Sequence, residues 1–342
     1  MTEKLLLVGN PDPTHVGAHL KHAAEGLGID TVMTDLTEAY HGPVWQNRIN
    51  WWVRGRRPTR LREFSAEVCE TCRTVQPTWL LATGIAPLEE TALKEIGKLR
   101  IRRLNYLTDD PWNPAHRAAW FLEALPLYDQ VFSTKRSLLD DLRQIGCPGV
   151  AYLPFAYAPE AHFPEQPSAG RGANGFAADV VFVGAADRDR VPYMVTLMRA
   201  GFQLALYGGY WNRYRRTAGA ARGHADLPTS RQAVGAAKVA LCLVRRANRD
   251  GHCMRSFEVP AIGGCMLTED TAEHREIFGE DGQTVVYFRT QEEMVERLRW
   301  LLAHDDERSR LANAARLLVT AGRNTYRDRL EAMLQRTGES NP

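Results

Sequence analysis

The residues best suited to chemistry gather in one stretch of the chain, residues 245–264. Gly251 lets the backbone approach a ligand closely, and the free amides of the helix predicted after it favour an anion. Two carboxylates, Asp250 and Glu258, stand eight residues apart and suit neighbouring hydroxyls, as on a ribose or a sugar ring. Four arginines offer charge-assisted hydrogen bonds to a diphosphate: Arg245, Arg246, Arg249 and Arg255.

A second group of candidates follows apolar runs in the first half of the chain. Asp109 and Asp110 come soon after one such run. Either could position or deprotonate a substrate hydroxyl, or could simply end the strand and satisfy a turn. Gly9 and Gly84 follow two earlier apolar runs and could line the same side of a site.

The elements that must position these residues follow one recurring pattern. Short apolar runs alternate with amphipathic stretches, which predicts parallel β-α-β units with right-handed crossovers. Strands are predicted at 5–8, 79–82, 101–107, 128–133, 179–184, 203–207, 239–244, 265–268 and 284–288. One helix is predicted to begin near Asn113-Pro114, where an N-cap residue precedes a proline, and another at the capping box formed by Thr290 and Glu293.

A proline-rich and then glycine-rich segment interrupts this alternation and is typical of a domain linker. We therefore predict an N-terminal domain at 1–154, a linker at 155–178 and a C-terminal domain at 179–320. A C-terminal helix at 321–342 could cross back to the first domain. The expected fold class is α/β, with two Rossmann-like domains facing each other across a cleft. Ligands of such sheets bind at the carboxyl ends of the strands, here in that cleft.

Composition narrows the class of protein. The chain has 342 residues, of which 44% are hydrophobic and 25% charged, as in ordinary soluble globular proteins. A formal charge of +2 is too balanced to predict nucleic-acid binding. No segment reaches the roughly 18 apolar residues of a membrane span, and the apolar run 5–8 is too short for a signal peptide. We therefore expect a cytoplasmic protein with reduced thiols, including core thiols at Cys69 and Cys72 rather than a zinc site.

The stretch 245–264 resembles the donor-site motif of two-domain (GT-B) glycosyltransferases of group 1, which are family 4-like, and especially their spore-maturation-protein-B-like branch. The family pattern is an acidic residue with a glycine, then a glutamate followed five residues later by a glycine. The chain matches it with Asp250-Gly251, Glu258 and Gly263. Flanking stretches resemble other parts of the family, among them Phe163-Pro164 in the interdomain segment, Gly184 after the strand that opens the second domain, and the strand-end turn Tyr207-Gly208.

The resemblance implies roles for these residues. Glu258 would hold the ribose hydroxyls of a nucleotide-diphosphate sugar, Asp250 would face the sugar, and the amides of Gly251, His252 and Cys253 would meet the diphosphate. The other residues expected at the donor are Arg255, Arg245, Asn248, Arg188, Gly184, Tyr207 and Gly208. The family's clamp of an arginine and a lysine is altered here, which leaves open whether Arg188 and Arg190, or Arg255, take its place.

The function implied is transfer of a sugar to a saccharide, protein or small-molecule acceptor, without metal or cofactor and with the anomeric configuration retained. Asp250, Asp109 and Asp110 are the candidate catalytic residues. Two alternatives remain: a nucleotide-sugar epimerase on the same fold, and a non-catalytic nucleotide-sugar-binding or assembly protein. The triplet Asp187-Arg188-Asp189 could bind a metal, but a polar loop is the favoured interpretation.

A basic run from Arg48 to Arg62 contains Trp51 and Trp52. It could contact an anionic acceptor or a membrane surface. No amphipathic helix of convincing length is visible in it. The favoured interpretation is therefore a solvated arginine-rich face with a buried tryptophan pair.

Overall fold

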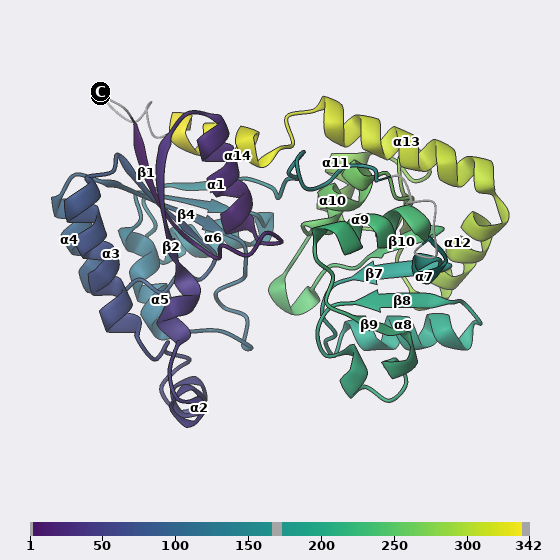
Figure 1. The fold of residues 1–342 in the computed structure, drawn as a ribbon, viewed down its shortest axis with the longest axis horizontal. Helices are drawn as coiled ribbons and strands as arrows, with labels where there is room; N and C mark the ends of the chain where they lie inside the picture. Colours follow the sequence, from purple (N-terminus) through teal and green to yellow (C-terminus); the bar gives the residue numbers. More distant parts are fainter. Residues whose placement is uncertain (1–2, 166–172, 337–342) are drawn as a thin grey trace. The chain divides into compact units, whose positions relative to one another are not determined.

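The computed structural model describes residues 3–165 and 173–336 (Figure 1). The chain forms two compact units: unit 1 comprises Met1–Pro154, Ala247–Arg249 and Tyr326–Pro342, and unit 2 comprises Phe155–Arg246 and Asp250–Thr325. Each unit is built around one six-stranded sheet. All the strand pairs are parallel, which confirms the predicted α/β class with two Rossmann-like sheets.

The sheet of unit 1 has the strand order β2-β1-β3-β4-β5-β6. Its strands are β1 (Lys4–Gly9), β2 (Asp30–Asp35), β3 (Trp79–Thr83), β4 (Arg102–Leu107), β5 (Gln130–Ser133) and β6 (Val150–Tyr152). The central strands β1 and β3 are almost wholly buried, and this is why their apolar runs could be read from the sequence. The two edge strands of this sheet carry no such signal in the sequence, because β2 contains threonines and aspartates and β6 has only three residues.

Helices pack around this sheet, and most of them connect one strand to the next along the chain (Figure 1). They are α1 (Val16–Gly26), α2 (Val44–Trp52), α3 (Leu61–Val75), α4 (Glu90–Lys98), α5 (Ala119–Ala124), α6 (Leu139–Gln144) and α14 (Tyr326–Arg336). Cys69 and Cys72 lie buried on the core side of α3, as expected. The helix predicted near Asn113 begins only at Ala119. The Asn113 side chain instead accepts from the amide of Ala115 at 3.0 Å and so closes a turn.

Unit 2 has the strand order β12-β11-β10-β7-β8-β9. Its strands are β7 (Val180–Val183), β8 (Leu204–Tyr207), β9 (Ala221–Gly223), β10 (Val239–Cys242), β11 (Met266–Glu269) and β12 (Val286–Phe288). Its helices are α7 (Ala173–Phe176), α8 (Arg190–Arg199), α9 (Leu227–Ala236), α10 (Arg255–Ile262), α11 (Ala272–Phe278), α12 (Gln291–Ala303) and α13 (Asp305–Ala321). The predicted cap of α12 is present, since the Thr290 side chain accepts from the amide of Glu293 at 3.1 Å.

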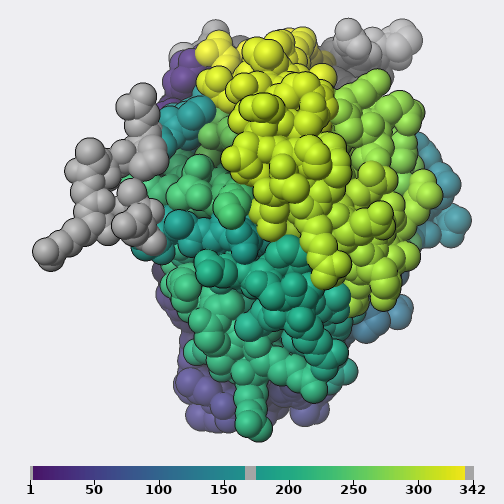
Figure 2. Space-filling model, turned by 90° about the vertical axis from the view of Figure 1, so that its right-hand side faces the viewer, coloured from purple at the N-terminus to yellow at the C-terminus, as the bar shows by residue number. Residues whose placement is uncertain are grey.

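The strand order of unit 2 decides which loops meet. β10 pairs with β7 on one side and with β11 on the other, although β7 and β10 are about sixty residues apart in sequence. The loops that follow these three strands therefore leave the same edge of the sheet, where α/β proteins bind ligands. On another side of the unit, α12 and α13 form a continuous cover (Figure 2), and α13 packs against α10.

Within the described ranges, no helix combines the length and the apolar character that crossing a membrane requires.

Candidate functional site

The loop between β10 and α10 carries most of the predicted site, and its own hydrogen bonds hold it closed. The Asp250 carboxylate accepts from the backbone N–H of Arg245 at 3.2 Å, and the Asp250 N–H donates to the Arg245 carbonyl at 3.3 Å. Arg249 takes a left-handed backbone conformation with a φ of 49°. The predicted order of strand, loop and short helix is confirmed for 245–264, and Asp250 lies half-buried in the loop.

Gly251 and His252 fasten the loop to α11. A Cβ on Gly251 would lie 2.7 Å from Cγ of Glu273, so the glycine makes room for that side chain. The Glu273 carboxylate in turn accepts from Nδ1 of His252 at 2.6 Å, while the Phe155 N–H donates to Nε2 of the same ring at 3.1 Å. The His252 ring is fully buried, and its two ring nitrogens hold the loop in place. Gly251 was predicted to let a ligand approach the backbone, and in the structure the space beside it is occupied by the Glu273 side chain.

Cys253 is part of a buried polar network behind the loop. Its N–H donates to Oγ of Ser256 at 3.1 Å, and Ser256 bonds to Nε2 of His274 at 2.8 Å. Burial lowers the pKa of His274 to about 4, so that ring is neutral. The Cys253 amide predicted to meet a diphosphate is therefore already engaged. Among the described residues, the amides of Gly251, Met254 and Arg255 have no acceptor.

Arg190, the first residue of α8, has an almost fully buried guanidinium. Nη1 donates to the carbonyl of Ala185 at 3.1 Å, and the group lies 5.4 Å from the centre of the Phe182 ring. Nε lies 3.5 Å from Oδ2 of Asp187, and within the part of the chain that the structure describes it makes no hydrogen bond. A charged donor is therefore held in a buried position with its hydrogen-bonding capacity incompletely used.

The guanidinium groups of Arg255 and Arg245 act on that of Arg190, and we call these three residues of unit 2 the arginine cluster. The pKa of Arg190 is lowered, first by burial and then by the positive charges of Arg255 and Arg245. Asp187 offsets only part of this repulsion, although Arg245 Nε also lies 3.8 Å from its Oδ2. The site therefore has an excess of positive charge that a bound anion would relieve.

Glu258 stands beside the arginine cluster in the first turn of α10. Its side chain is 15% exposed, and Oε1 lies 3.8 Å from Nε2 of His162. Burial raises the pKa of Glu258 to about 7, although the positive charge of Arg255 opposes the shift. Hydrogen bonds that a ligand donates to this carboxylate would favour its ionised form, and the hydroxyls of a sugar can donate such bonds.

A further carboxylate at the same sheet edge is not among the residues expected from the sequence. Glu269, the last residue of β11, accepts from the Val244 N–H at 2.8 Å and from Nη2 of Arg246 at 3.2 Å. The Tyr193 hydroxyl on α8 also bonds to Nη2 of Arg246, at 2.8 Å. Arg246 is thus held by protein partners. Only the run of apolar residues before Glu269 could have marked this position as a strand end.

The remaining donor-side predictions fall into three environments. Arg188 is exposed. The Asp187 carboxylate accepts from the amides of Asp189 and Arg190, so the D-x-D triplet forms a helix-entry turn. Tyr207 is buried within β8. Asn248 is buried too and is assigned to unit 1.

Gly184 and Gly208 bring two of the loops into contact. Gly208 has a φ of 122°, and a Cβ there would lie 2.8 Å from the backbone N of Ala185 and would overlap the carbonyl of Gly184. The loops after β7 and β8 therefore touch through their backbones. This close approach supports the turn on which Asp187 and Arg190 stand.

In unit 1, Asp110 fits the turn interpretation. Its carboxylate accepts from Nε and Nη2 of Arg249 at 2.6 and 3.0 Å and from the amide of Trp112 at 2.9 Å. Its own N–H donates to Oδ1 of Asn248 at 2.8 Å. Asp109 is half-buried and accepts from the Thr108 hydroxyl at 3.1 Å. Of the two acids, Asp109 is the better candidate to face a substrate.

Gly9 and Gly84 end β1 and follow β3 at the same edge of the unit 1 sheet. A Cβ on Gly9 would lie 3.1 Å from Cα of Gly17 on α1, and Gly84 has a φ of 61°. Both glycines are therefore explained by backbone geometry. Their predicted position near an acceptor is not tested by it.

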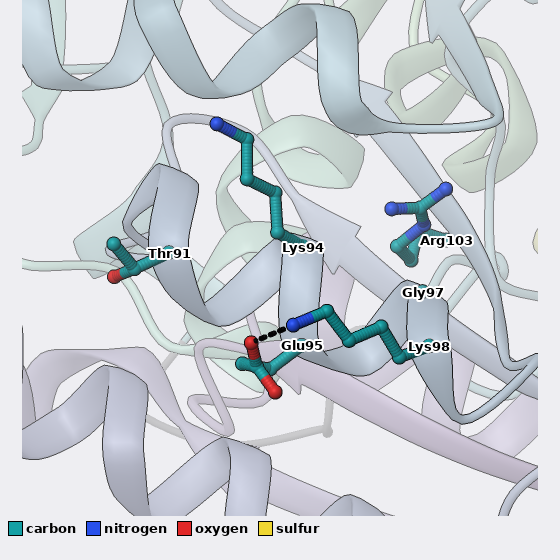
Figure 3. A pocket seen from close by; sticks show the side chains of 6 residues that line it. All are labelled: Thr91, Lys94, Glu95, Gly97, Lys98 and Arg103. Atoms are coloured by element: carbon teal, nitrogen blue, oxygen red, sulfur yellow. Dashed lines mark hydrogen bonds and ion pairs between the residues drawn. The ribbon is translucent and has the colours of Figure 1, made fainter.

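A shallow open pocket of about 540 Å³ lies elsewhere on unit 1. It is lined by Thr91, Lys94, Glu95, Gly97, Lys98 and Arg103 (Figure 3). Lys98 pairs with Glu95 at 2.6 Å, and Arg103 is bonded to Asp129 at the same distance. None of the predicted site residues lines this pocket, and the charges around it are neutralised by neighbours.

Comparisons with known proteins identify the fold. Residues 190–335 match the family model described as glycosyl transferase-like. Among solved structures, sucrose-phosphate synthase from Thermosynechococcus elongatus is 14% identical, with a TM-score of 0.69 and 98% of each chain covered. HepE of Anabaena in complex with UDP-glucose is 12% identical, with a TM-score of 0.67 over 98% of this chain and 99% of that one. A protein of Listeria monocytogenes assigned as a UDP-N-acetylglucosamine 2-epimerase is 13% identical, with a TM-score of 0.61 over 100% and 98%. No curated protein matches the sequence significantly.

The resemblance to GT-B glycosyltransferases is therefore confirmed, whereas the narrower spore-maturation-protein-B-like branch stays a prediction. Residues 190–335 are thus similar to the glycosyl transferase-like family, and the chain as a whole has the GT-B fold.

Proposed function

We propose that this protein transfers a sugar from a nucleotide-diphosphate sugar to an acceptor, and that unit 2 binds the donor. The observation that carries the proposal is the arginine cluster beside Glu258 at the start of α10. It joins an excess of positive charge to a carboxylate suited to hydroxyls, and a nucleotide-diphosphate sugar presents both complementary groups.

The diphosphate would lie against the arginine cluster. Guanidinium groups form strong charge-assisted hydrogen bonds with phosphate oxygens. Arg190 has an unused Nε, and the unpaired amides of Gly251, Met254 and Arg255 add neutral donors at the N-terminus of α10. Because this charge is already assembled in the free protein, binding needs little reorganisation.

The ribose would lie against Glu258. Two hydroxyls that donate to its carboxylate would favour the ionised form and lower the pKa of this group from about 7. Asp250 would face the sugar, as the family resemblance implies. HepE of Anabaena, whose structure was solved with UDP-glucose bound, has the same fold, which supports a nucleotide sugar as the ligand class.

The reaction would use the same groups. The bond between the anomeric carbon and the diphosphate oxygen breaks, and the arginine cluster stabilises the charge that develops on the leaving diphosphate. The acceptor oxygen bonds to the anomeric carbon and loses its proton. We assign no protein nucleophile, and we propose that the configuration is retained and that neither a metal nor a further cofactor takes part.

Unit 1 would bind the acceptor, which is a saccharide, a protein or a small molecule. Asp109 at the carboxyl end of β4 is the group proposed to position or deprotonate its hydroxyl. Six buried free cysteines support a reducing, cytoplasmic location.

A thermal-shift screen of nucleoside diphosphates and their sugars tests donor binding. A ligand of the native state raises its stability by about 2.7 kcal/mol at a hundredfold excess over Kd. We expect a nucleoside diphosphate and its sugar to raise the Tm, and Glu258→Ala to weaken their binding without unfolding the protein. Unchanged affinity in that variant, measured by calorimetry, removes Glu258 from the site.

Product analysis separates the three functions. Sugar transfer requires an acceptor and releases the nucleoside diphosphate. An epimerase would instead convert the donor sugar with no acceptor present. Donor binding without turnover over a wide panel of acceptors would identify a binding or assembly protein.

A further inference from the structure

Helix α2 presents its apolar side chains to solvent. Trp45 is 65% exposed and Trp52 78% exposed, and Val53 directly after the helix is 77% exposed. Val44, Ile49 and Trp51 are exposed as well. The buried tryptophan pair expected at 51–52 is therefore wrong. Figure 1 shows α2 projecting from the rest of unit 1, so these side chains do not belong to its core.

The polar side of α2 faces the protein instead. Asn50 is buried and its Nδ2 donates to the hydroxyl of Thr59 at 3.0 Å. The same hydroxyl bonds to Oδ1 of Asn47, whose Nδ2 donates to the Gly42 carbonyl at 3.3 Å. Amide side chains thus hold α2 to the protein. An ordinary surface helix of a soluble protein has the opposite arrangement, with its apolar stripe inward.

The charged residues of the segment that carries this face are all arginines. Residues 39–62 contain six arginines and no aspartate, glutamate or lysine. Arg56 donates to the carbonyls of Pro114, Ala115 and Arg117, and Arg57 and Arg60 pair with acids outside the segment. The arginines that remain exposed on or near the helix are Arg48, Arg54 and Arg62.

We propose that α2 and the turn after it, residues 44–54, dock on the surface of an anionic lipid bilayer. Three tryptophans on one short segment match the side chain that prefers the boundary between hydrocarbon and head groups. Arg48 and Arg54 lie among them and would meet anionic head groups. At nine residues α2 is far too short to span a bilayer, so it lies in the interface. A bilayer fits better than a protein partner, because the aromatic side chains stand on a projection with positive charge and not in a groove.

The proposal rests on α2 alone and is independent of the proposed donor site. Its test is co-sedimentation of the full chain with two kinds of vesicle. One is made of phosphatidylcholine alone, and the other also contains about 30 mol% of the anionic lipid phosphatidylglycerol. We expect binding to the anionic vesicles and much weaker binding to the neutral ones. Arg48→Gln with Arg54→Gln should lower the partition coefficient about 25-fold, since each basic residue near the surface contributes about fivefold.

Trp45→Ser with Trp52→Ser should abolish binding to anionic vesicles while the Tm stays unchanged. The matched control is Trp300→Ser, at an exposed tryptophan on α12 of unit 2, which should bind as the unaltered protein does. Two results would overturn the proposal: no binding to anionic vesicles, or equal binding by the Trp45/Trp52 variant. If vesicle binding is absent, a dimer in solution that this variant converts to a monomer would identify a second copy of the chain as the occupant of this face.

Discussion

Arg190 is the side chain on which the charge of the donor site depends most directly. It is buried, its Nε makes no hydrogen bond within the described chain, and Arg255 and Arg245 repel it. We expect Arg190→Met to weaken binding of a nucleoside diphosphate by about 1.5–3 kcal/mol, the range for hydrogen bonds to charged groups. Methionine keeps apolar contact with the Phe182 ring, so the fold should persist.

The matched control for Arg190 is two residues away. Arg188→Met changes the same residue type in the same turn, but at an exposed position. Isothermal titration calorimetry should find that the Arg188→Met variant binds a nucleoside diphosphate with the same affinity as the unaltered protein. Equal losses in the two variants would mean that net charge, and not the position of Arg190, governs binding.

Glu258 should make stability depend on pH. Its folded pKa of about 7 exceeds its ordinary value of 4.5, so the folded protein binds more protons than the unfolded chain between these pH values. Glu258 therefore contributes its full stabilisation of the folded state below pH 4.5, and this contribution is lost as the pH rises through 7. By linkage the loss is at most about 3 kcal/mol.

Glu258→Gln removes this titration. Urea unfolding at pH 5 and pH 8 should show the variant gaining stability relative to the unaltered protein as the pH rises. Glu296→Gln, on the exposed face of α12, is the control and should leave the pH profile unchanged. Parallel profiles for the Glu258 variant and the unaltered protein would contradict the prediction.

At the scale of the element, the turns after β7 and β8 stand in backbone contact at Gly208. An alanine there would press its Cβ against Gly184 and Ala185, and φ at this position is 122°. We expect Gly208→Ala to lower the free energy of unfolding by about 2–4 kcal/mol, from backbone strain and overlap together.

Gly209→Ala is the control for that substitution, because a Cβ on Gly209 meets nothing within 4 Å and its φ is not positive. Chemical denaturation should place its stability within a few tenths of a kcal/mol of the unaltered protein. If Gly208→Ala were equally mild, the two loops would be more adaptable than their packing indicates.

At the scale of the whole molecule, the last helix completes unit 1. α14 packs against α1, with Tyr326 stacked on His19 at 5.1 Å and Leu330 fully buried. Arg329 adds a bond from Nε to the Pro154 carbonyl at 2.9 Å. The stability of the first 154 residues therefore depends on residues more than 170 positions away.

Leu330→Ala should weaken this packing by about 2–4 kcal/mol, as for other fully buried leucines. Hydrogen exchange should be faster in α1, while α9 of unit 2 keeps its protection. Leu317→Ala on α13, where the side chain is 65% exposed, is the matched control and should change neither helix. Unchanged exchange in α1 of the Leu330 variant would show that α14 does not support it.

The central strands, the α/β class and the position of the loop 245–264 between a strand and a short helix can be predicted from the amino-acid sequence. Buried parallel strands need continuous apolar runs, and such runs are local features that can be read without the fold. Edge strand β2, with its polar pattern, lacks that signal. The helix expected at Asn113 failed for a similar local reason, since an N-cap residue before a proline also fits a turn.

Which polar groups meet depends instead on how the strands pair in three dimensions. The pairing of β10 with β7 and β11 brings Arg190, Arg255 and Glu269 to one sheet edge from three separate segments. Arg190 is buried while Arg188 is exposed, and the sequence of this turn does not indicate which of the two arginines is buried. The burial and the electrostatic surroundings of a side chain depend on contacts between residues far apart in the chain. A local sequence pattern indicates only whether a segment favours a helix, a strand or a turn.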